Sequence, residues 1–255
     1  MIDFDDFVRL TDVEWRTSVE VERGIFIAEG LLTIQRALAA GCELRTVVSD
    51  ERWLADLHAL GISKERIASV DEVMLEQVTG YHVHRGALAA FQRPPLLDAA
   101  DVLTTAQRLV VVEDVVDHAN IGAIVRSAAA FDIDAILLTP RCADPLYRRA
   151  IKVSMGNVFK IRWSRIDWPD GLRRLHEAGF TTLAMTPDAA ATDLRDVAAD
   201  VSGGKWALLL GTEGDGLHPK TIRDAAMRVR IPMSHDVDSL NVAAATAVAC
   251  YALTR

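Results

Sequence analysis

Residues 231–253 read IPMSHDVDSLNVAAATAVACYAL, and the fold of the chain depends on this stretch close to its end. A short apolar strand over 231–233 leads into a polar turn, and an alanine-rich helix opens at Ser239, Leu240 and Asn241. Asp238 or Ser239 is expected to cap that helix, because an oxygen there can accept from the first-turn amides. The alanines allow neighbouring backbone to pass close to a narrow apolar face of the helix, formed by Val242, Ala245, Val248, Ala249 and Leu253.

The rest of the chain alternates short apolar runs with helical segments, which predicts α/β architecture with parallel sheets covered on both faces. With 255 residues, half of them apolar, the chain suffices for one large domain or two modest ones. A Pro-Pro pair at 94–95 cannot continue a helix or a central strand. We therefore expect a small α/β domain over 1–92, a linker over 93–104 and a second α/β domain over 105–255.

Composition narrows the function. The net charge of −8 argues against indiscriminate nucleic-acid binding. Residues 141–174 nevertheless hold nine basic and three acidic residues, which fits either local phosphate contact or a solvated, salt-bridged face. No apolar run approaches the roughly 18 residues that span a bilayer. The three cysteines are far apart and fit no metal spacing, which predicts a cytoplasmic protein.

Three segments that follow apolar strands carry polar residues, and ligands of parallel sheets bind beyond the carboxyl ends of the strands. The first, 113–120, leads into a helix over 121–131 that Asn120 is expected to cap, with Arg126 on a face away from its buried stripe. The second is GTEGDGL at 211–217, where Glu213 stands between glycines. Its glycine spacing is the reverse of the dinucleotide fingerprint, so we reject a nicotinamide site. The third is the turn that ends at Asn241.

Three motifs in order resemble the SpoU (TrmH-like) family of RNA ribose 2′-O-methyltransferases, of the wider SPOUT class. They are NIGAIVRS at 120–127, LGTEGDGL at 210–217, and IPM at 231–233 with SLNV at 239–242. The resemblance covers roughly residues 109–255, and FIAEG at 26–30 with His84-Arg85-Gly86 is similar to the small amino-terminal substrate domain of many members. Departures from the family pattern are Thr212, where Asn or Ala is usual, and the segment 116–119.

The resemblance implies a catalytic domain with a deep trefoil knot, preceded by a small α/β RNA-binding domain. It implies S-adenosyl-L-methionine as the cofactor, held by Gly211, Ile231, Met233 and Leu240. Arg126 is the expected catalytic residue, either as a general base or as a phosphate anchor that stabilises alkoxide charge. The residues expected to orient it and the hydroxyl are Asn120, Glu213, Ser239 and Asn241.

The resemblance also implies a homodimer packed through the knotted domain, with no membrane and no metal. We expect RNA contact by Arg148, Arg149 and Lys152, and ribosomal RNA rather than transfer RNA as the substrate. A catalytically silent RNA-binding relative, a base-nitrogen methyltransferase and an ordinary Rossmann methyltransferase remain the alternatives. His82 and His84 alternate in a strand-like stretch without a third ligand nearby, so a metal there is not expected, and His118 has no assigned role.

Overall fold

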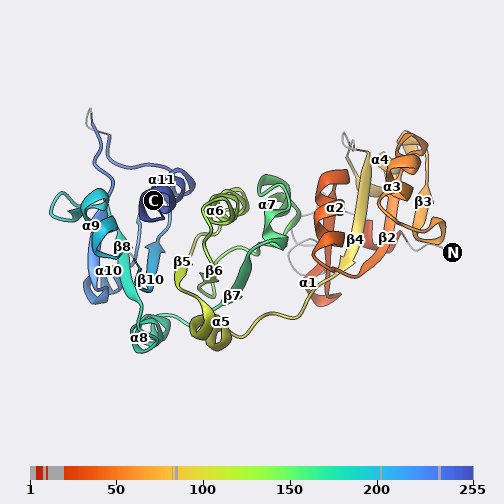
Figure 1. Ribbon diagram of the computed structural model, residues 1–255. Coiled ribbons are helices and arrows are strands. Elements are labelled where there is room, and N and C mark those ends of the chain that lie inside the picture. Colours follow the sequence, from red (N-terminus) through yellow and green to blue (C-terminus); the bar gives the residue numbers. More distant parts are fainter. Residues whose placement is uncertain are drawn as a thin grey trace. The chain divides into compact units, whose positions relative to one another are not determined.

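The computed structural model describes residues 4–7, 10, 20–81, 83, 86–201, 203–234 and 237–254. The chain forms two compact units (Figure 1). Unit 1 comprises Met1–Pro95 and Leu146–Phe159, and unit 2 comprises Leu96–Pro145 and Lys160–Arg255. A segment from the second half of the sequence, 146–159, therefore belongs to the same compact unit as the first 95 residues.

Unit 1 is built on a four-stranded mixed sheet with the strand order β1-β4-β2-β3. Strand β4 runs antiparallel to β1 and to β2, whereas β3 runs parallel to β2. This sheet departs from the all-parallel expectation because β4 returns between β1 and β2. The strands are β1 (Ile25–Glu29), β2 (Leu44–Ser49), β3 (Ile67–Ser69) and β4 (Ala87–Gln92). The helices are α1 (Glu20–Glu22), α2 (Leu31–Ala39), α3 (Leu54–Ala59), α4 (Glu72–Thr79) and α7 (Arg148–Val153), with 3-10 turns at Asp5–Phe7, Glu51–Trp53, Lys64–Arg66 and Asn157–Phe159.

Unit 2 is built on a seven-stranded sheet with the order β7-β6-β5-β10-β8-β11-β9, in which every neighbouring pair is parallel. The α/β architecture with a parallel sheet is therefore confirmed for this unit. Its strands are β5 (Arg108–Val112), β6 (Ala135–Leu138), β7 (Arg162–Arg165), β8 (Thr181–Met185), β9 (Thr192–Asp193), β10 (Trp206–Leu210) and β11 (Met227–Arg230). Its helices are α5 (Ala99–Thr105), α6 (His118–Ala130), α8 (Asp170–Glu177), α9 (Leu194–Asp200), α10 (Pro219–Asp224) and α11 (Val242–Leu253).

The central strands of unit 2 are buried on both faces, as their continuous apolar sequence requires. Every residue of β10 is buried, as is every residue of β6. Helix α11 packs against α6 and α9, so the end of the chain lies beside the segment that follows β5 (Figure 1). This arrangement brings the three polar segments of the sequence to one end of one sheet.

The structure differs from the sequence-based expectations at three places that matter for the site. Strand β11 ends at Arg230, so 231–233 is not a strand; Pro232 has no N–H to donate to a ladder. Helix α5 lies over 99–105, in the stretch expected to be a linker. Val248, expected on the buried face of α11, is 44% exposed, while Cys250 and Thr246 are buried.

Among the described residues, no helix has both the length and the apolar character needed to cross a bilayer.

Candidate active site

A cavity of about 390 Å³ opens in unit 2 where β8 and β10 end. All four residues predicted to hold a cofactor line it, namely Gly211, Ile231, Met233 and Leu240. Glu213, Ser239 and Asn241 line the same cavity. The volume falls in the range that suits a small organic ligand. The second and third sequence motifs thus converge on one cavity, although Gly211 and Asn241 are separated by thirty residues of chain.

The sequence reasoning missed part of this wall. Met185, Thr186 and Pro187, at the end of β8, line the cavity together with Val242 and Ala245 of α11. The end of β8 carries no charged residue or glycine motif, so only its place beside β10 in the sheet would have indicated it.

The glycine loop 211–217 folds back on itself, and its first position requires glycine. A Cβ at Gly211 would lie 2.1 Å from the carbonyl carbon of Gly216, which leaves room for glycine alone. The Thr212 amide donates to the Gly216 carbonyl at 3.1 Å, and the Gly216 amide donates back to the Thr212 carbonyl at 3.2 Å. This tight hairpin presents Glu213 near its tip, where the residue is exposed.

Asn241 joins the three polar segments through its side-chain amide. Its Nδ2 donates to Asn120 Oδ1 at 3.0 Å and also to Glu213 Oε1. Its Oδ1 accepts from the amides of Ala243 and Ala244, at 3.0 and 3.3 Å. Both hydrogens of the amide nitrogen and the amide oxygen are therefore used. The structure thus brings Asn120, Glu213 and Asn241 together at the edge of the cavity.

Both predicted helix caps are wrong, and the physical reason is the same in each case. Asp117, not Asn120, caps α6, with its carboxylate accepting from the Asn120 amide at 2.8 Å. Asn241, not Asp238 or Ser239, caps α11. Several neighbouring polar residues compete for each cap, and the contact between the Asn120 and Asn241 side chains selects among them. Ser239 lines the cavity instead.

Arg126 lies in α6 six residues after Asn120, and its side chain is exposed. Within the described part of the chain its guanidinium forms no hydrogen bond or ion pair, so the structure does not join it to the Asn120–Glu213–Asn241 cluster. Guanidinium groups keep their charge at all ordinary pH values.

The predicted RNA-binding residues occur in unit 1, on α7. Lys152 Nζ lies 2.8 Å from Glu29 Oε1, and Arg148 Nη1 lies 3.9 Å from Glu29 Oε2. Arg148 also donates to the Tyr81 hydroxyl and to the Leu10 carbonyl, the latter at 3.2 Å. Arg149 is exposed. Two of the three cations are thus engaged with a buried carboxylate of β1.

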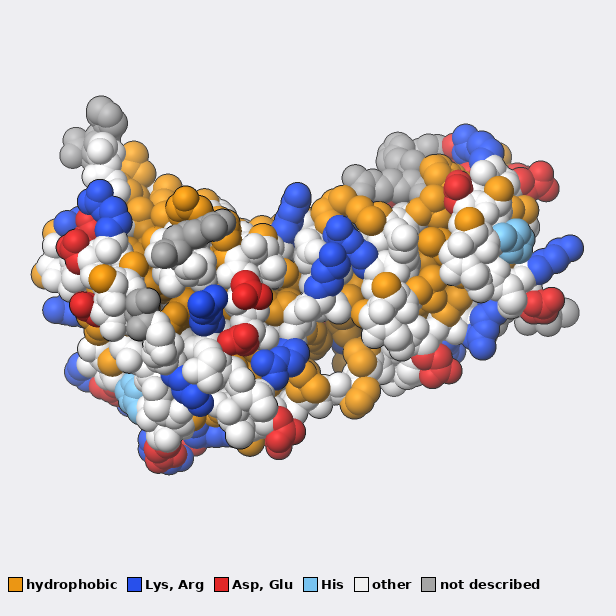
Figure 2. All heavy atoms as spheres, in the orientation of Figure 1, with side chains coloured by type: hydrophobic (Ala, Val, Ile, Leu, Met, Phe, Trp, Pro, Cys, Tyr) orange, Lys and Arg blue, Asp and Glu red, His pale blue; other side chains and the backbone are white. Residues whose placement is uncertain are grey.

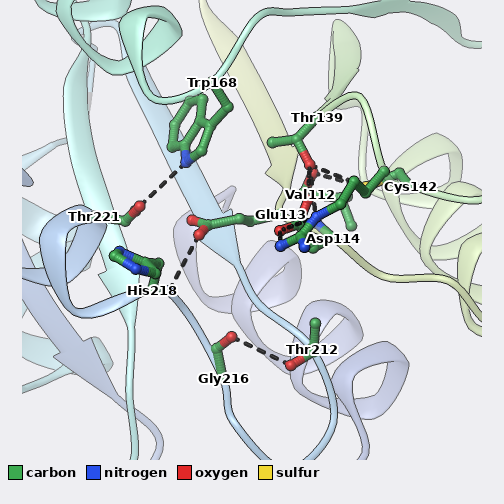
Figure 3. Close-up of polar contacts among 11 residues, drawn as sticks. Val112, Glu113, Asp114, Thr139, Cys142, Trp168, Thr212, Gly216, His218 and Thr221 are labelled. Atoms are coloured by element: carbon green, nitrogen blue, oxygen red, sulfur yellow. Dashed lines mark hydrogen bonds and ion pairs between the residues drawn. The ribbon is translucent and has the colours of Figure 1, made fainter.

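A second group of polar side chains lies where β5 ends (Figure 3). Asp114 accepts from Thr139 Oγ1 at 2.8 Å and from Arg141 Nε at 3.1 Å, and these bonds, Arg141 first, hold its pKa below the ordinary value. Its neighbour Glu113 is buried and accepts from the His218 amide at 3.1 Å. Trp168 Nε1 donates to Thr221 Oγ1 at 3.1 Å, which ties α10 to the segment before α8.

Two of the three cysteines are buried in the core. Burial raises the pKa of Cys250 to about 12 and also raises that of Cys142, so both thiols behave as small core groups. Among the described residues no group of three His, Cys, Asp or Glu side chains could hold a metal ion. His82, His84 and Arg85 lie outside the described residues, as do 235–236 of the polar turn; His118 begins α6.

Comparison with known proteins gives three results. A model of the SpoU rRNA Methylase family matches residues 107–251. An uncharacterized tRNA/rRNA methyltransferase of Mycobacterium tuberculosis is 43% identical over 256 residues, covering 98% of this chain and 88% of that protein. The 23S rRNA (guanosine-2′-O-)-methyltransferase RlmB of Acinetobacter baylyi is 31% identical, covering 76% of this chain and 79% of that protein.

Among solved structures, an AdoMet-bound rRNA methyltransferase from Sinorhizobium meliloti superimposes with a TM-score of 0.80 at 26% identity. The match covers 96% of this chain and 93% of that one, so it includes both units.

Proposed function

The chain belongs to the SpoU rRNA Methylase family, and we propose that it is an S-adenosyl-L-methionine-dependent RNA methyltransferase acting on a ribose 2′-hydroxyl. The observation that carries this proposal is the Asn241 amide, which joins Asn120 and Glu213 at the edge of the cavity. Three separate polar segments converge there, and methyl transfer to a hydroxyl depends mainly on positioning and charge stabilisation.

The cavity residues fit S-adenosylmethionine. Ile231, Met233 and Leu240 offer an apolar wall for an adenine, and backbone at Gly211 can approach a ligand closely because no side chain intervenes. When bound, this cofactor supplies a methyl group on a positively charged sulfur. The folded-back glycine loop forms part of the cavity wall, where it would exclude water and hold the ligand in one pose.

Arg126 is the proposed catalytic residue. A guanidinium offers N–H donors and no acceptor atom, so we assign Arg126 the phosphate beside the target ribose and the negative charge that develops on the 2′-oxygen. Asn120, Glu213, Ser239 and Asn241 orient the hydroxyl and the guanidinium. Support comes from the exposed, unbonded state of Arg126 in the described chain, which leaves all its donors available to a substrate.

We further propose that the catalytic unit is tied in a deep trefoil knot and pairs with a second copy through α6 and α11. Support for the knot is the packing of α11 against α6 and α9, with alanines at the contact. Support for the dimer is the exposure of Val116, Val248 and Tyr251 (68, 44 and 55%) on or beside these two helices. Hydrophobic side chains gather over the region of α11 in Figure 2, as an interface requires. A partner copy would then bring substrate contacts to Arg126.

For the substrate we propose ribosomal RNA in the cytoplasm, with residues 1–92 as the RNA-binding domain, 93–104 joining it to the catalytic domain at 105–255. The A. baylyi relative, by its name a 23S rRNA enzyme, supports ribosomal over transfer RNA. Exposed Arg149 and the half-exposed end of Lys152 are the proposed phosphate contacts, while Arg148, only 12% exposed, is held by Glu29 and Tyr81.

The test of this function combines binding and product analysis. Purified protein should bind S-adenosylmethionine, and nucleosides from treated rRNA should contain a ribose 2′-O-methyl group. Arg126→Ala should lower turnover by about 1000-fold while cofactor binding survives, and Arg126→Lys should retain partial activity if the role is electrostatic. Arg173→Ala, an exposed arginine of α8, serves as the matched control.

A methylated base in place of a methylated ribose, or normal turnover by Arg126→Ala, would overturn the proposal. Cofactor binding without any methylation of RNA would favour the silent RNA-binding alternative.

A further inference from the structure

Glu113 is an anomaly in unit 2. It follows the last residue of β5, is 4% exposed, and its Oε1 accepts from the His218 amide at 3.1 Å. Its Oε2 is also buried and has no hydrogen-bond partner among the described residues. A buried carboxylate with one unpaired oxygen costs free energy, so its presence calls for an explanation other than stability.

The contacts of Glu113 connect it to both ends of the glycine loop. Its backbone amide donates to the Leu210 carbonyl at 2.7 Å, and its carboxylate accepts from the His218 amide. Leu210 and His218 are the residues immediately before and after 211–217. Figure 3 shows the Glu113 carboxylate extending from the end of β5 toward His218. One residue therefore holds the start of the loop through its backbone and the end of the loop through its side chain.

The loop is also held by Glu213, which bonds to Asn241, and by Leu217, which is buried in the core of unit 2. The Glu113 carboxylate adds the hydrogen bond to the backbone amide that follows Leu217. Within the loop, the two backbone bonds between Thr212 and Gly216 close the hairpin but do not fix it to the sheet. Beyond the loop, His218 caps α10, because its ring Nδ1 accepts from the Lys220 amide. The His218 backbone therefore joins the loop to that helix. A hydrogen bond from a backbone amide to a charged carboxylate is about twice as strong as one to a neutral acceptor.

We propose that Glu113 is a positioning residue of the methyltransferase site: its carboxylate clamps the His218 amide and thereby holds the loop 211–217 in the shape that forms the cofactor wall. The inference rests on the proposed function for its ligand, whereas the clamp itself belongs to the protein without cofactor. Glu113 does not line the cavity and so acts through the loop rather than on substrate.

Two variants remove the clamp from opposite sides. Glu113→Ala deletes the acceptor. His218→Pro deletes the donor amide together with the ring, and the φ of −57° at His218 suits proline. His218→Ala keeps the amide hydrogen and removes the ring, which separates the backbone contact from the helix cap. Glu113→Gln retains a carbonyl oxygen and should restore much of the clamp.

The first measurement is hydrogen exchange of the protein without cofactor. Amides of 212–217 should exchange at least about tenfold faster in Glu113→Ala and in His218→Pro than in wild type, while α6 and α11 exchange as before. The second is calorimetric affinity for S-adenosylmethionine, which should fall about 10- to 30-fold in both variants and less than about threefold in His218→Ala and Glu113→Gln. The affinity of the double variant Glu113→Ala, His218→Pro should be no lower than that of either single variant, because both changes remove the same contact.

Unchanged loop exchange in both Glu113→Ala and His218→Pro would overturn the clamp, as would additive losses in the double variant. Equal losses in His218→Ala and His218→Pro would assign the effect to the ring and would also overturn it. If wild-type protein failed to bind S-adenosylmethionine, the proposed function would fall, yet the exchange data would still decide whether Glu113 holds the loop. If Glu113→Ala does not fold, His218→Pro carries the same test.

Discussion

Each unit of this protein buries a glutamate at the end of a strand, Glu29 of β1 in unit 1 and Glu113 after β5 in unit 2. The two carboxylates differ in their partners. In unit 1, Glu29 accepts from Lys152 Nζ at 2.8 Å and from the Tyr81 hydroxyl at 3.3 Å, with Arg148 at 3.9 Å. In unit 2, among the described residues, the Glu113 carboxylate accepts from the His218 amide alone, and its Oε2 has no hydrogen-bond partner there.

The partners of Glu29 also contact one another. The Arg148 guanidinium lies 4.5 Å from the centre of the Tyr81 ring and donates to its hydroxyl, so the two cations and the phenol form one network around the carboxylate. Such a network satisfies the buried charge and holds α7 onto β1. Among the described residues the Glu113 carboxylate is not part of such a network, and its one hydrogen bond holds the end of a single loop. From this difference we expect Glu29 to stabilise unit 1 as a whole, and Glu113 to contribute to the stability of one loop.

The strongest test of that contrast is the same substitution at both positions. Glu29→Gln leaves the Arg148 guanidinium buried without its counter-charge, and we expect a loss of about 3 kcal/mol in the free energy of unfolding. Glu113→Gln removes a carboxylate that was half unpaired, and we expect a change below about 1 kcal/mol. Urea unfolding followed by circular dichroism measures both. Equal losses at the two positions would erase the distinction between them.

A smaller effect should separate the cations of α7 from each other. Lys152→Met removes an ammonium that is 43% exposed, so the free energy of unfolding should fall by about 0.5 to 1 kcal/mol. Arg149→Met should leave stability within about 0.5 kcal/mol, because the side chain is exposed.

RNA binding by these two variants tests the phosphate contacts proposed above. Arg149→Met should reduce the slope of log affinity against log salt by about one phosphate contact. A salt slope equal to that of wild type in both Arg149→Met and Lys152→Met would mean that the two side chains are solvated and that α7 serves only the fold.

The sequence was sufficient to predict the convergence of the site but not its internal bonds. Asn120, Glu213 and Asn241 each follow a strand end of a parallel sheet, and such ends meet at one edge, so their proximity could be anticipated. Which residue capped each helix could not be, because Asp238, Ser239 and Asn241 are equally able to cap by their chemistry. The contact of Asn241 with Asn120, 121 residues away in sequence, decides between them.

The pairing of charges was also beyond the sequence. The basic stretch 141–174 was open to two interpretations, and the structure shows that Lys152 and Arg148 face Glu29, about 120 residues earlier. Glu113 gave no signal at all, since an acid after an apolar strand is common and only the fold brings His218 to it. Long-range polar contacts of this kind depend on tertiary packing, which local patterns do not encode.

The smallest effect concerns Asp114, the neighbour of Glu113, whose carboxylate is fully paired at the surface. The Arg141 guanidinium is the main cause that lowers the pKa of Asp114 from 3.8, with Thr139 adding to it. A carboxyl whose pKa is lower in the folded state contributes stability above the unfolded value, near pH 4, and loses it as the pH falls through the folded value. Arg141→Ala should therefore lower the free energy of unfolding at pH 6. The loss should be smaller than those expected for Glu29→Gln and Lys152→Met, because Arg141 is 79% exposed. The difference from wild type should shrink below pH 4, which denaturant midpoints at pH 6 and pH 3 measure. A difference of equal size at both pH values would show that Arg141 acts through contacts other than Asp114. The ion pair with Arg141 would then not explain how the paired carboxylate of Asp114 differs from that of its neighbour Glu113.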